Sequence, residues 1–163
     1  MLVDSRKSTG VVGWGLVGLG RHADQYIAPA FAQAAESRLA AVFSADTVRA
    51  EAFAARHGVP RAYSALADML DDPAISCVYV CSPNHRHYEH VVQAASANRH
   101  VLCEKPLATT VMKSRLLVTI CAEGGVTLGV GFHLRHNPVH LRVRKLVAEG
   151  AIGTPLHLQV NYV

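Results

Sequence analysis

The sequence has few aromatic residues, few charges and no long apolar run. Of its 163 residues, 6% are aromatic and 17% are charged, whereas 50% are hydrophobic. No apolar stretch reaches the roughly 18–20 residues that a membrane-spanning helix needs, so we expect that the protein has no transmembrane helix. The apolar run behind Arg6 and Lys7 is short and broken by Gly13, Gly15 and Gly18, which argues against a signal peptide. The apolar content also excludes disorder and collagen-like repetition.

The cysteines form neither a CxxC pair nor a zinc-like spacing. All four lie inside apolar segments: Cys77, Cys81, Cys103 and Cys121. We therefore expect reduced, buried thiols in a cytoplasmic protein. His85, His87 and His90 are close in sequence, but Glu89 is the only carboxylate beside them, so we expect no metal site there.

The charge balance is mildly basic. Sixteen lysines and arginines against twelve acidic residues give a net charge of +4, with ten histidines in reserve. This balance suits an anionic partner without identifying one. Arg142, Arg144 and Lys145 are clustered, but no aromatic residues are interleaved with them, so we expect a solvated helix face and no nucleic-acid partner.

Short β-branched runs alternate with longer segments of helical periodicity over the first 130 residues. The runs predict strands at 11–17, 39–43, 76–81, 100–103 and 126–130, with a shorter strand near Ala62. The periodic segments predict helices at 24–36, 47–57, 64–70, 87–97 and 110–123, the first kinked or split at Pro29. Strand followed by helix, repeated, predicts an α/β fold with a doubly wound parallel sheet.

After residue 130 the pattern changes. Residues 139–149 have apolar positions at helical spacing and are followed by Gly150, a typical helix stop. Residues 156–163 alternate between apolar and polar, which predicts a half-buried strand of a second, antiparallel sheet. We therefore expect residues 131–163 to be the beginning of an incomplete α+β domain.

Two overlapping glycine patterns lie near the first strand, and the position of the strand separates them. A dinucleotide-binding loop must follow the first strand and open the first helix, because the pyrophosphate lies at that helix's N-terminus. The pattern that starts at Gly13 would leave only two apolar residues of strand. The pattern that starts at Gly18 fits: Gly18 makes the tight turn, Gly20 lets the pyrophosphate approach, and Ala23 packs the helix on the strand.

The end of the second strand bears on the choice between NAD and NADP. An acid about 20 residues after the glycine loop would bind the ribose 2′-hydroxyl of NAD. Ser44 occupies that place, and Asp46 comes two residues late. Ser44 would tolerate a 2′-phosphate and Arg49 could pair with it, so the sequence favours NADP without excluding NAD.

Two further motifs carry a resemblance to a known family. The fourth strand ends in Val-Cys-Ser-Pro-Asn-His-Arg-His (80–87), and the fifth ends in Val-Leu-Cys-Glu-Lys-Pro (101–106). Together with the glycine loop, their order and spacing resemble the Gfo/Idh/MocA family of NAD(P)-dependent oxidoreductases, which act mostly on sugars, inositols and related polyols. Residues 131–138 look like the segment that follows in that family.

The resemblance implies a site. Its catalytic residue would be Lys105, whose ammonium would hydrogen-bond the reacting hydroxyl and carry its proton during hydride transfer. The Lys105–Pro106 bond would be cis. The cofactor-binding residues would be Gly18, Leu19, Gly20, Arg21, His22, Ala23, Ser44, Arg49, Ser82, Pro83, Asn84, His87, Glu104 and Lys105. Of these, residues 82–84 and His87 would line the nicotinamide-ribose side, with Glu104 and Lys105 beneath the nicotinamide.

Members of the family are roughly twice as long as this chain and carry a second domain that supplies the substrate pocket. We therefore expect residues 1–130 to form an NAD(P)-binding Rossmann domain and residues 131–163 to begin a C-terminal substrate or oligomerisation domain. The chain would be part of a longer dehydrogenase or a natural half that pairs with itself or another subunit, and would turn over poorly alone. The alternative is a non-catalytic NAD(P)-binding or sensing module.

Overall fold

The computed structural model describes residues 10–161. These residues form two compact units, one ending at Gly131 and the next beginning at Phe132. Within the described range, no helix is both long and apolar enough to cross a membrane.

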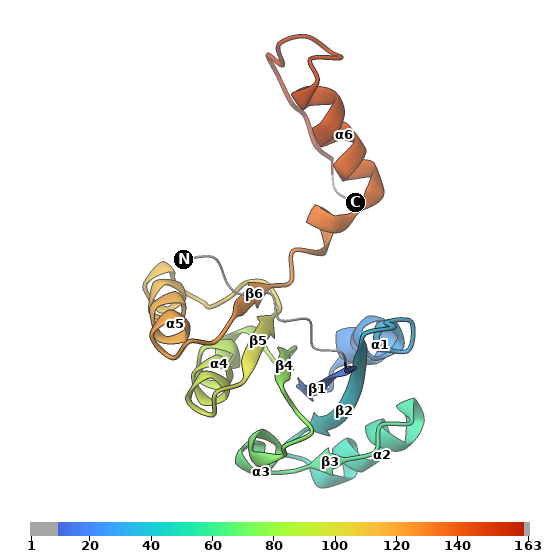
Figure 1. Cartoon of the computed structure of the whole chain (residues 1–163), viewed down its shortest axis with the longest axis vertical. Coiled ribbons are helices and arrows are strands. Elements are labelled where there is room, and N and C mark those ends of the chain that lie inside the picture. The colour runs from blue at the N-terminus through green and yellow to red at the C-terminus, as the bar shows by residue number, and fades with distance from the viewer. Residues whose placement is uncertain (1–9, 162–163) are drawn as a thin grey trace. The chain divides into compact units, whose positions relative to one another are not determined.

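The first unit is built on a parallel sheet (Figure 1). Its strands are β1 (Val12–Val17), β2 (Ser37–Phe43), β3 (Ala62–Tyr63), β4 (Cys77–Val80), β5 (His100–Cys103) and β6 (Leu128–Val130). They lie in the order β3-β2-β1-β4-β5-β6, and every neighbouring pair is parallel. This is the doubly wound order, with the direction of winding reversed between β1 and β4. The predicted α/β fold is confirmed.

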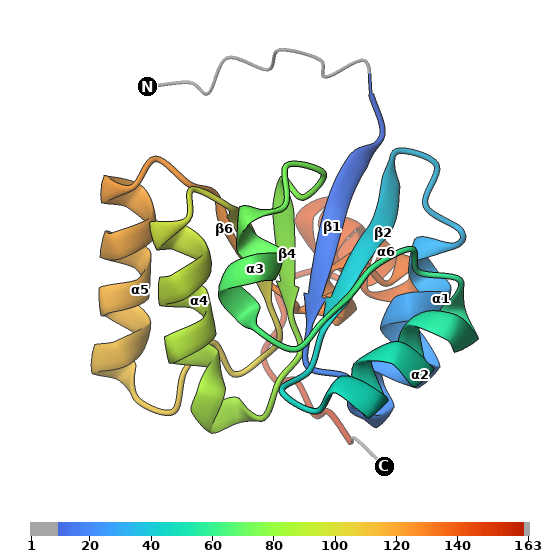
Figure 2. The ribbon, with the colours of Figure 1, turned by 90° about the horizontal axis from the view of Figure 1, so that it is seen from below.

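Helices cover both faces of the sheet. The helical segments are η1 (Ala23–Ile27), α1 (Ala28–Phe31), α2 (Thr47–His57), α3 (Leu66–Asp71), η2 (Asn84–Arg86), α4 (His87–Ser96) and α5 (Val111–Glu123). Figure 2 shows α3, α4 and α5 on one face and α1 and α2 on the other. Because successive strand residues point to opposite faces, Leu16 packs in the core under α1 and α2, whereas Val17 packs in the core under the other helices.

The helix predicted at 24–36 is wrong in its second half. The helical run changes from π-helix to α-helix between Ile27 and Ala28, just before Pro29, and it ends at Phe31, after which residues 32–36 lead into β2. Its first part, η1, is a π-helix in which the Ala28 N–H donates to the Ala23 carbonyl. Pro29 has no N–H to give to the carbonyl four residues earlier, so a regular α-helical register cannot continue through it.

The cysteines are all free thiols. Cys103 and Cys121 are buried as expected, whereas Cys77 and Cys81 are only half-buried. Burial raises the pKa of all four thiols, that of Cys81 to about 11 and that of Cys103 to about 12. They are therefore protonated at neutral pH and behave as small apolar side chains.

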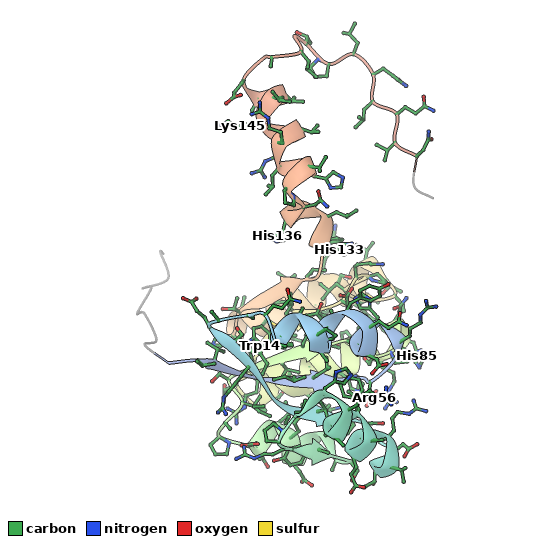
Figure 3. All side chains as sticks on the ribbon, turned by 90° about the vertical axis from the view of Figure 1, so that its right-hand side faces the viewer. Trp14, Arg56, His85, His133, His136 and Lys145 are labelled. Atoms are coloured by element: carbon green, nitrogen blue, oxygen red, sulfur yellow. The ribbon has the colours of Figure 1, made fainter. Side chains whose placement is uncertain are left out.

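The second unit contains a short helical turn, η3 (His133–His136), and the helix α6 (Pro138–Ala148), whose side chains are drawn in Figure 3. Asn137 caps α6 by accepting from the Val139 N–H at 2.9 Å, and Gly150 follows it with a φ of +70°. The strand predicted at 156–163 is not formed over residues 156–161, and 162–163 lie outside the described range. Leu156 and Leu158 are 94% and 81% exposed. A strand needs a hydrogen-bonded neighbour, and residues 132–161 supply none.

Candidate cofactor and catalytic site

The glycine loop makes a turn that only glycine permits. Gly18 follows β1 with a φ of +94°, and a Cβ atom there would lie 2.5 Å from the backbone nitrogen and Cα of Ser82. The loops after β1 and β4 therefore touch through their backbones. They meet where the winding of the sheet reverses, which is where ligands bind in sheets of this type.

The next positions of the loop differ in their surroundings. A Cβ atom on Gly20 would meet nothing within 4 Å, so the loop surface there is open to a ligand. Ala23 has no exposed surface and packs in the core with Leu16. Gly13 and Gly15 lie within β1, as predicted, and a Cβ atom on Gly15 would approach Met69 to 2.9 Å. This geometry fits a dinucleotide loop that starts at Gly18.

The segment after β2 is organised by the start of α2. Ser44 Oγ accepts from the Asp46 N–H at 3.2 Å, and Asp46 Oδ1 accepts from the Arg49 N–H at 3.1 Å. Asp46 is therefore the N-cap of α2, which gives its carboxylate a structural partner. At the end of β2, Ser44 occupies the position where an acidic side chain would bind the ribose 2′-hydroxyl of NAD.

A pocket of about 180 Å³ connects the glycine loop with α2. It is lined by Leu19, Gly20, Arg21, Asp24, Arg49, Ala52, Phe53 and Arg56. Arg49 and Arg56 are seven residues apart and so share one face of α2. Arg56 was not among the predicted site residues, although its spacing from Arg49 is a signal in the sequence. Figure 3 labels Arg56 on α2.

Among the described residues, Asp24 is the only acid that lines this pocket. Its Oδ1 lies 2.8 Å from His57 Nε2 and 2.7 Å from Arg56 Nη1. The hydrogen bond from His57, together with that from Arg56, lowers the pKa of Asp24. The pocket thus holds three guanidinium groups and one carboxylate, and this carboxylate already has two partners. The side chains that line the pocket therefore carry a net positive charge, which favours binding of an anion.

The segment after β4 divides the predicted residues into two groups. Pro83 and Asn84 are exposed and open to a ligand. Ser82 is buried, and its Oγ lies 2.9 Å from His90 Nδ1, while burial, followed by the nearby Arg86, lowers the pKa of His90. The buried side chains of Ser82 and His90 therefore pack against the inner side of the turn after β4.

His87 is 1% exposed, so its ring is closed to a ligand in this structure. Its two ring nitrogens each lie 2.8 Å from a backbone carbonyl oxygen, one of Pro106 and one of Ser82. Instead of lining the site, the ring joins the turn after β4 to the turn after β5.

Glu104 and Lys105 follow β5, and the Lys105–Pro106 peptide bond is cis. Glu104 is buried, whereas Lys105 is exposed. The Tyr79 hydroxyl donates to Glu104 Oε1 at 2.8 Å, and burial, followed by this hydrogen bond, raises the pKa of Tyr79. No signal in the sequence marks Tyr79, because a tyrosine in a buried strand is ordinary core.

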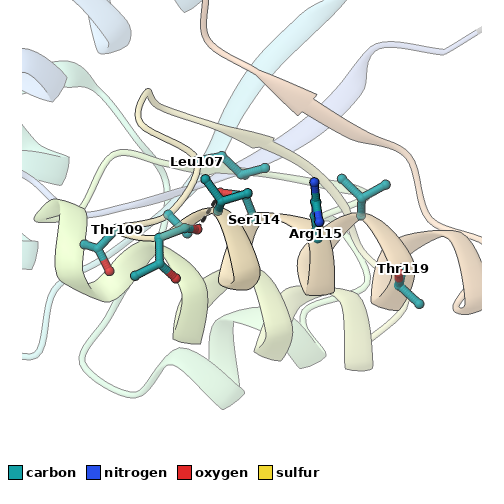
Figure 4. A pocket seen from close by; sticks show the side chains of 9 residues that line it. Leu107, Thr109, Ser114, Arg115 and Thr119 are labelled. Carbon is teal, nitrogen blue, oxygen red and sulfur yellow. Dashed lines mark hydrogen bonds between the residues drawn. The ribbon is translucent and has the colours of Figure 1, made fainter.

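A larger open hollow of about 720 Å³ lies along the first turns of α5 (Figure 4). It is lined by Leu107, Ala108, Thr109, Thr110, Val111, Ser114, Arg115, Val118 and Thr119. None of the predicted site residues lines it. Figure 4 draws one hydrogen bond among these residues, from Ser114 Oγ to the carbonyl oxygen of Thr110 at the start of α5. Size alone therefore does not locate the site.

Residues 12–132 match the sequence model of the Gfo/Idh/MocA oxidoreductase family, described as having an NAD-binding Rossmann fold. The chain belongs to this family. It is 35% identical over 147 residues to 1,5-anhydro-D-fructose reductase of Ensifer adhaerens, an alignment that covers 90% of this chain and 44% of the reductase.

Solved structures of family members show the same fold. A 3-ketoreductase from Actinomadura kijaniata, solved with NADP, superimposes with a TM-score of 0.81 at 28% identity, over 86% of this chain and 44% of that one. A scyllo-inositol dehydrogenase from Lactobacillus casei, solved with NAD(H), gives 0.80 at 25% identity, over 88% and 42%. The chain thus spans less than half the length of these relatives, and among them both dinucleotides occur.

Proposed function

We propose that this chain is the cofactor-binding part of an NADP-dependent oxidoreductase that transfers hydride between nicotinamide and a hydroxyl or carbonyl carbon of a sugar or polyol. One observation carries the proposal: the open glycine loop, the exposed Pro83–Asn84 turn and the exposed Lys105 follow β1, β4 and β5, which are neighbours in the sheet. Parallel strands bring these three segments to one edge. The oxidoreductase family membership supports the same reaction class.

The residues for holding the dinucleotide are assigned from this arrangement. Residues 18–22 would hold the pyrophosphate, with Gly20 as the point of closest approach because its surface is open, and the buried Ala23 would pack the helix on the sheet. Pro83 and Asn84 would contact the nicotinamide ribose. Ser82 and His87 would support that turn from beneath, since their side chains are buried. This assignment changes the expected roles of Ser82 and His87 from contact to support.

The preference for NADP rests on the pocket beside the glycine loop. A 2′-phosphate carries a charge near −2 at neutral pH, and guanidinium groups bind phosphate through paired hydrogen bonds. Arg21 and Arg49 line the pocket and have no acidic partner among the described residues. Arg56 also lines it, but its guanidinium forms an ion pair with Asp24. Ser44 adds a neutral neighbour where an acid would repel the phosphate.

Lys105 would handle the proton of the reaction. The nicotinamide, when bound, supplies a carbon that accepts or releases a hydride. In oxidation, the Lys105 amine takes the hydroxyl proton of the substrate while the adjacent C–H bond breaks and its electron pair leaves with the hydride. In reduction, the Lys105 ammonium returns a proton to the oxygen as the carbon receives the hydride. Charge and atoms balance in both directions.

The domain organisation forms part of the proposal. Residues 1–130 would be the cofactor domain, and residues 131–163 would begin a domain that supplies the substrate pocket or the subunit interface. The relatives, of which the chain spans less than half, support this division. Turnover would then require that second domain, and a homo-oligomer or a pairing with a C-terminal half would provide a complete site.

Dinucleotide titration tests the proposal. We expect NADPH to bind at least tenfold more tightly than NADH, measured by the change in NADPH fluorescence on the purified chain. Arg49→Ala should weaken NADPH binding by about tenfold, the equivalent of about 1.4 kcal/mol, and leave NADH binding unchanged. Arg115→Ala, which removes an exposed arginine of α5, is the matched control. Millimolar or weaker binding of both dinucleotides to the folded chain would overturn the proposal.

A further inference from the structure

The carboxylate of Glu104 accepts hydrogen bonds from two distant segments and from the backbone of the next residue. Its Oε1 lies 2.8 Å from the Tyr79 hydroxyl of β4 and 3.1 Å from His22 Nε2, at the start of the first helical run. Its Oε2 accepts from the backbone N–H of Lys105 at 3.2 Å. One buried carboxylate therefore connects the glycine loop, the centre of the sheet and the turn that carries Lys105.

The surroundings of Glu104 hold it in one place. Its side chain is 11% exposed, and a Cβ atom on Gly131 would lie 3.1 Å from Oε1, so the carboxylate is also closely packed from the end of β6. Burial and the hydrogen bond to Glu104 both raise the pKa of Tyr79, so the phenol keeps its proton and stays a donor. Tyr79 thus anchors the inner side of the carboxylate.

The His22 side of this cluster is open. The His22 side chain is 46% exposed, and its residue comes two positions after Gly20, where the loop surface has free space. Its ring packs against that of Tyr26, with centroids 5.4 Å apart. A ligand that occupies the glycine loop would therefore reach the His22 end of the cluster, while Tyr79 occupies its enclosed end.

We propose that His22 and Tyr79 are positioning residues that act through Glu104, coupling dinucleotide binding at the glycine loop to the placement of the Lys105 backbone. The proposal rests on the function assigned above. A pyrophosphate bound at residues 18–20 would contact the start of the helical run that carries His22 and fix its position. His22 then holds Oε1 of Glu104, and the other oxygen of that rigid carboxylate holds the Lys105 N–H. Tyr79 keeps the carboxylate from turning when His22 moves.

Three variants separate positioning from packing. His22→Ala removes the donor, whereas His22→Gln keeps an N–H at a similar reach. Tyr79→Phe removes only the hydroxyl from the buried side of Glu104. His85→Ala, which removes an exposed histidine of η2, is the control. Each is prepared in the full 163-residue chain, and each is measured for thermal unfolding, NADPH affinity and the ¹H–¹⁵N chemical shift of the Lys105 amide.

The coupling predicts a specific pattern. In the native chain the Lys105 amide shift should change on saturation with NADPH. His22→Ala should weaken NADPH binding by about tenfold and abolish most of that shift change, and His22→Gln should restore the affinity to within about threefold. Tyr79→Phe should alter the Lys105 shift even without NADPH. The control should match the native chain in all three measurements.

The outcomes distinguish this inference from the function on which it rests. If the native chain does not bind NADPH, the proposed function fails first. If the native chain binds NADPH but His22→Ala binds equally well, or if His22→Gln is no better than His22→Ala, the coupling is wrong. A Lys105 amide that does not respond to NADPH in the native chain also overturns it.

Discussion

The ring of His87 holds the backbone of Pro106: Nδ1 of the buried imidazole lies 2.8 Å from the Pro106 carbonyl oxygen. The other ring nitrogen lies at the same distance from the Ser82 carbonyl. Both contacts are to backbone carbonyl oxygens, so the link that His87 makes does not depend on the side chains of Ser82 and Pro106. Two turns that follow β4 and β5 are thereby joined beneath the proposed nicotinamide site.

Replacing His87 should lower stability more than replacing an exposed histidine. His87→Ala removes the buried ring that lies between the Ser82 and Pro106 carbonyl oxygens, takes away its N–H donor and opens a small cavity, so we expect a loss of about 2–4 kcal/mol in the free energy of unfolding. Urea denaturation of the chain measures this. His85→Ala should stay within about 0.5 kcal/mol of the native chain because its side chain is exposed. Equal effects of the two substitutions would contradict the bridging role.

Gly18 and Gly20 should respond in opposite ways to the same substitution. Gly18→Ala places a Cβ atom 2.5 Å from the Ser82 backbone at a φ of +94°, so it should lower the melting temperature and with it dinucleotide binding. Gly20→Ala meets no neighbour within 4 Å, so it should leave the melting temperature within a few degrees but weaken NADPH binding about tenfold or more. Differential scanning fluorimetry and NADPH titration measure the two effects. A Gly20→Ala chain that binds NADPH normally would show that the pyrophosphate lies elsewhere.

Asp72 should make stability depend on acid pH. Burial opposes its ionisation, but hydrogen bonds from the Ala74 N–H, Arg61 and Tyr63 outweigh burial and lower its pKa. A carboxyl whose pKa is lower in the folded state contributes stability above its unfolded pKa of about 3.9, and this contribution is lost as the pH falls through the folded value.

Asp72→Asn should therefore be less stable than the native chain at pH 7 by about 1–3 kcal/mol, and the gap should narrow below about pH 4. Urea denaturation at a series of pH values checks this. Asp68→Asn, on an exposed carboxyl of α3, is the control and should show little change. A gap that stays constant down to pH 2 would show that Asp72 does not act through its charge.

Lys105→Ala should separate binding from chemistry. The side chain is exposed, so the free energy of unfolding should change by less than about 0.5 kcal/mol and NADPH affinity by less than about threefold. In a form of the enzyme that carries its substrate domain, kcat should fall by about 10²–10⁴-fold, because the proton acceptor is gone. Unchanged turnover in that form would exclude Lys105 as the proton carrier and favour a dinucleotide-sensing role.

Most of the first unit could be predicted from local pattern. Strands of a parallel sheet are buried on both faces, so β1, β2, β4 and β5 stand out as continuous apolar runs, and helix α2 (Thr47–His57) has the predicted bounds. Two predictions failed where local pattern was not enough. The Ala-rich segment 24–36 carries no stop signal before β2, yet its helix ends at Phe31. Residues 156–161 alternate like a strand but find no partner among the described residues.

The candidate site was likewise predictable in part. Spacing and motif predicted which residues follow β1, β2, β4 and β5, and strand direction alone brings those ends to one edge. The inward orientation of His87 could not be predicted, since a histidine after a strand gives no sign of which carbonyls its ring will meet. Tyr79 was missed because its importance depends on Glu104, which it faces. Arg56 had a local signal in its spacing from Arg49, but its contact with Asp24 is visible only in the tertiary structure.

By itself, the sequence determined the alternating α/β architecture, the family and the set of strand ends that carry polar side chains, because periodicity and glycine placement are local properties of the chain. Only the tertiary structure decided which of those side chains face a ligand and which face the backbone. Burial and hydrogen-bond partners come from segments far apart in sequence: Glu104 meets His22 across 82 positions, and His87 meets Pro106 across 19. Contacts of that kind are set by packing of the whole unit, which no local pattern encodes.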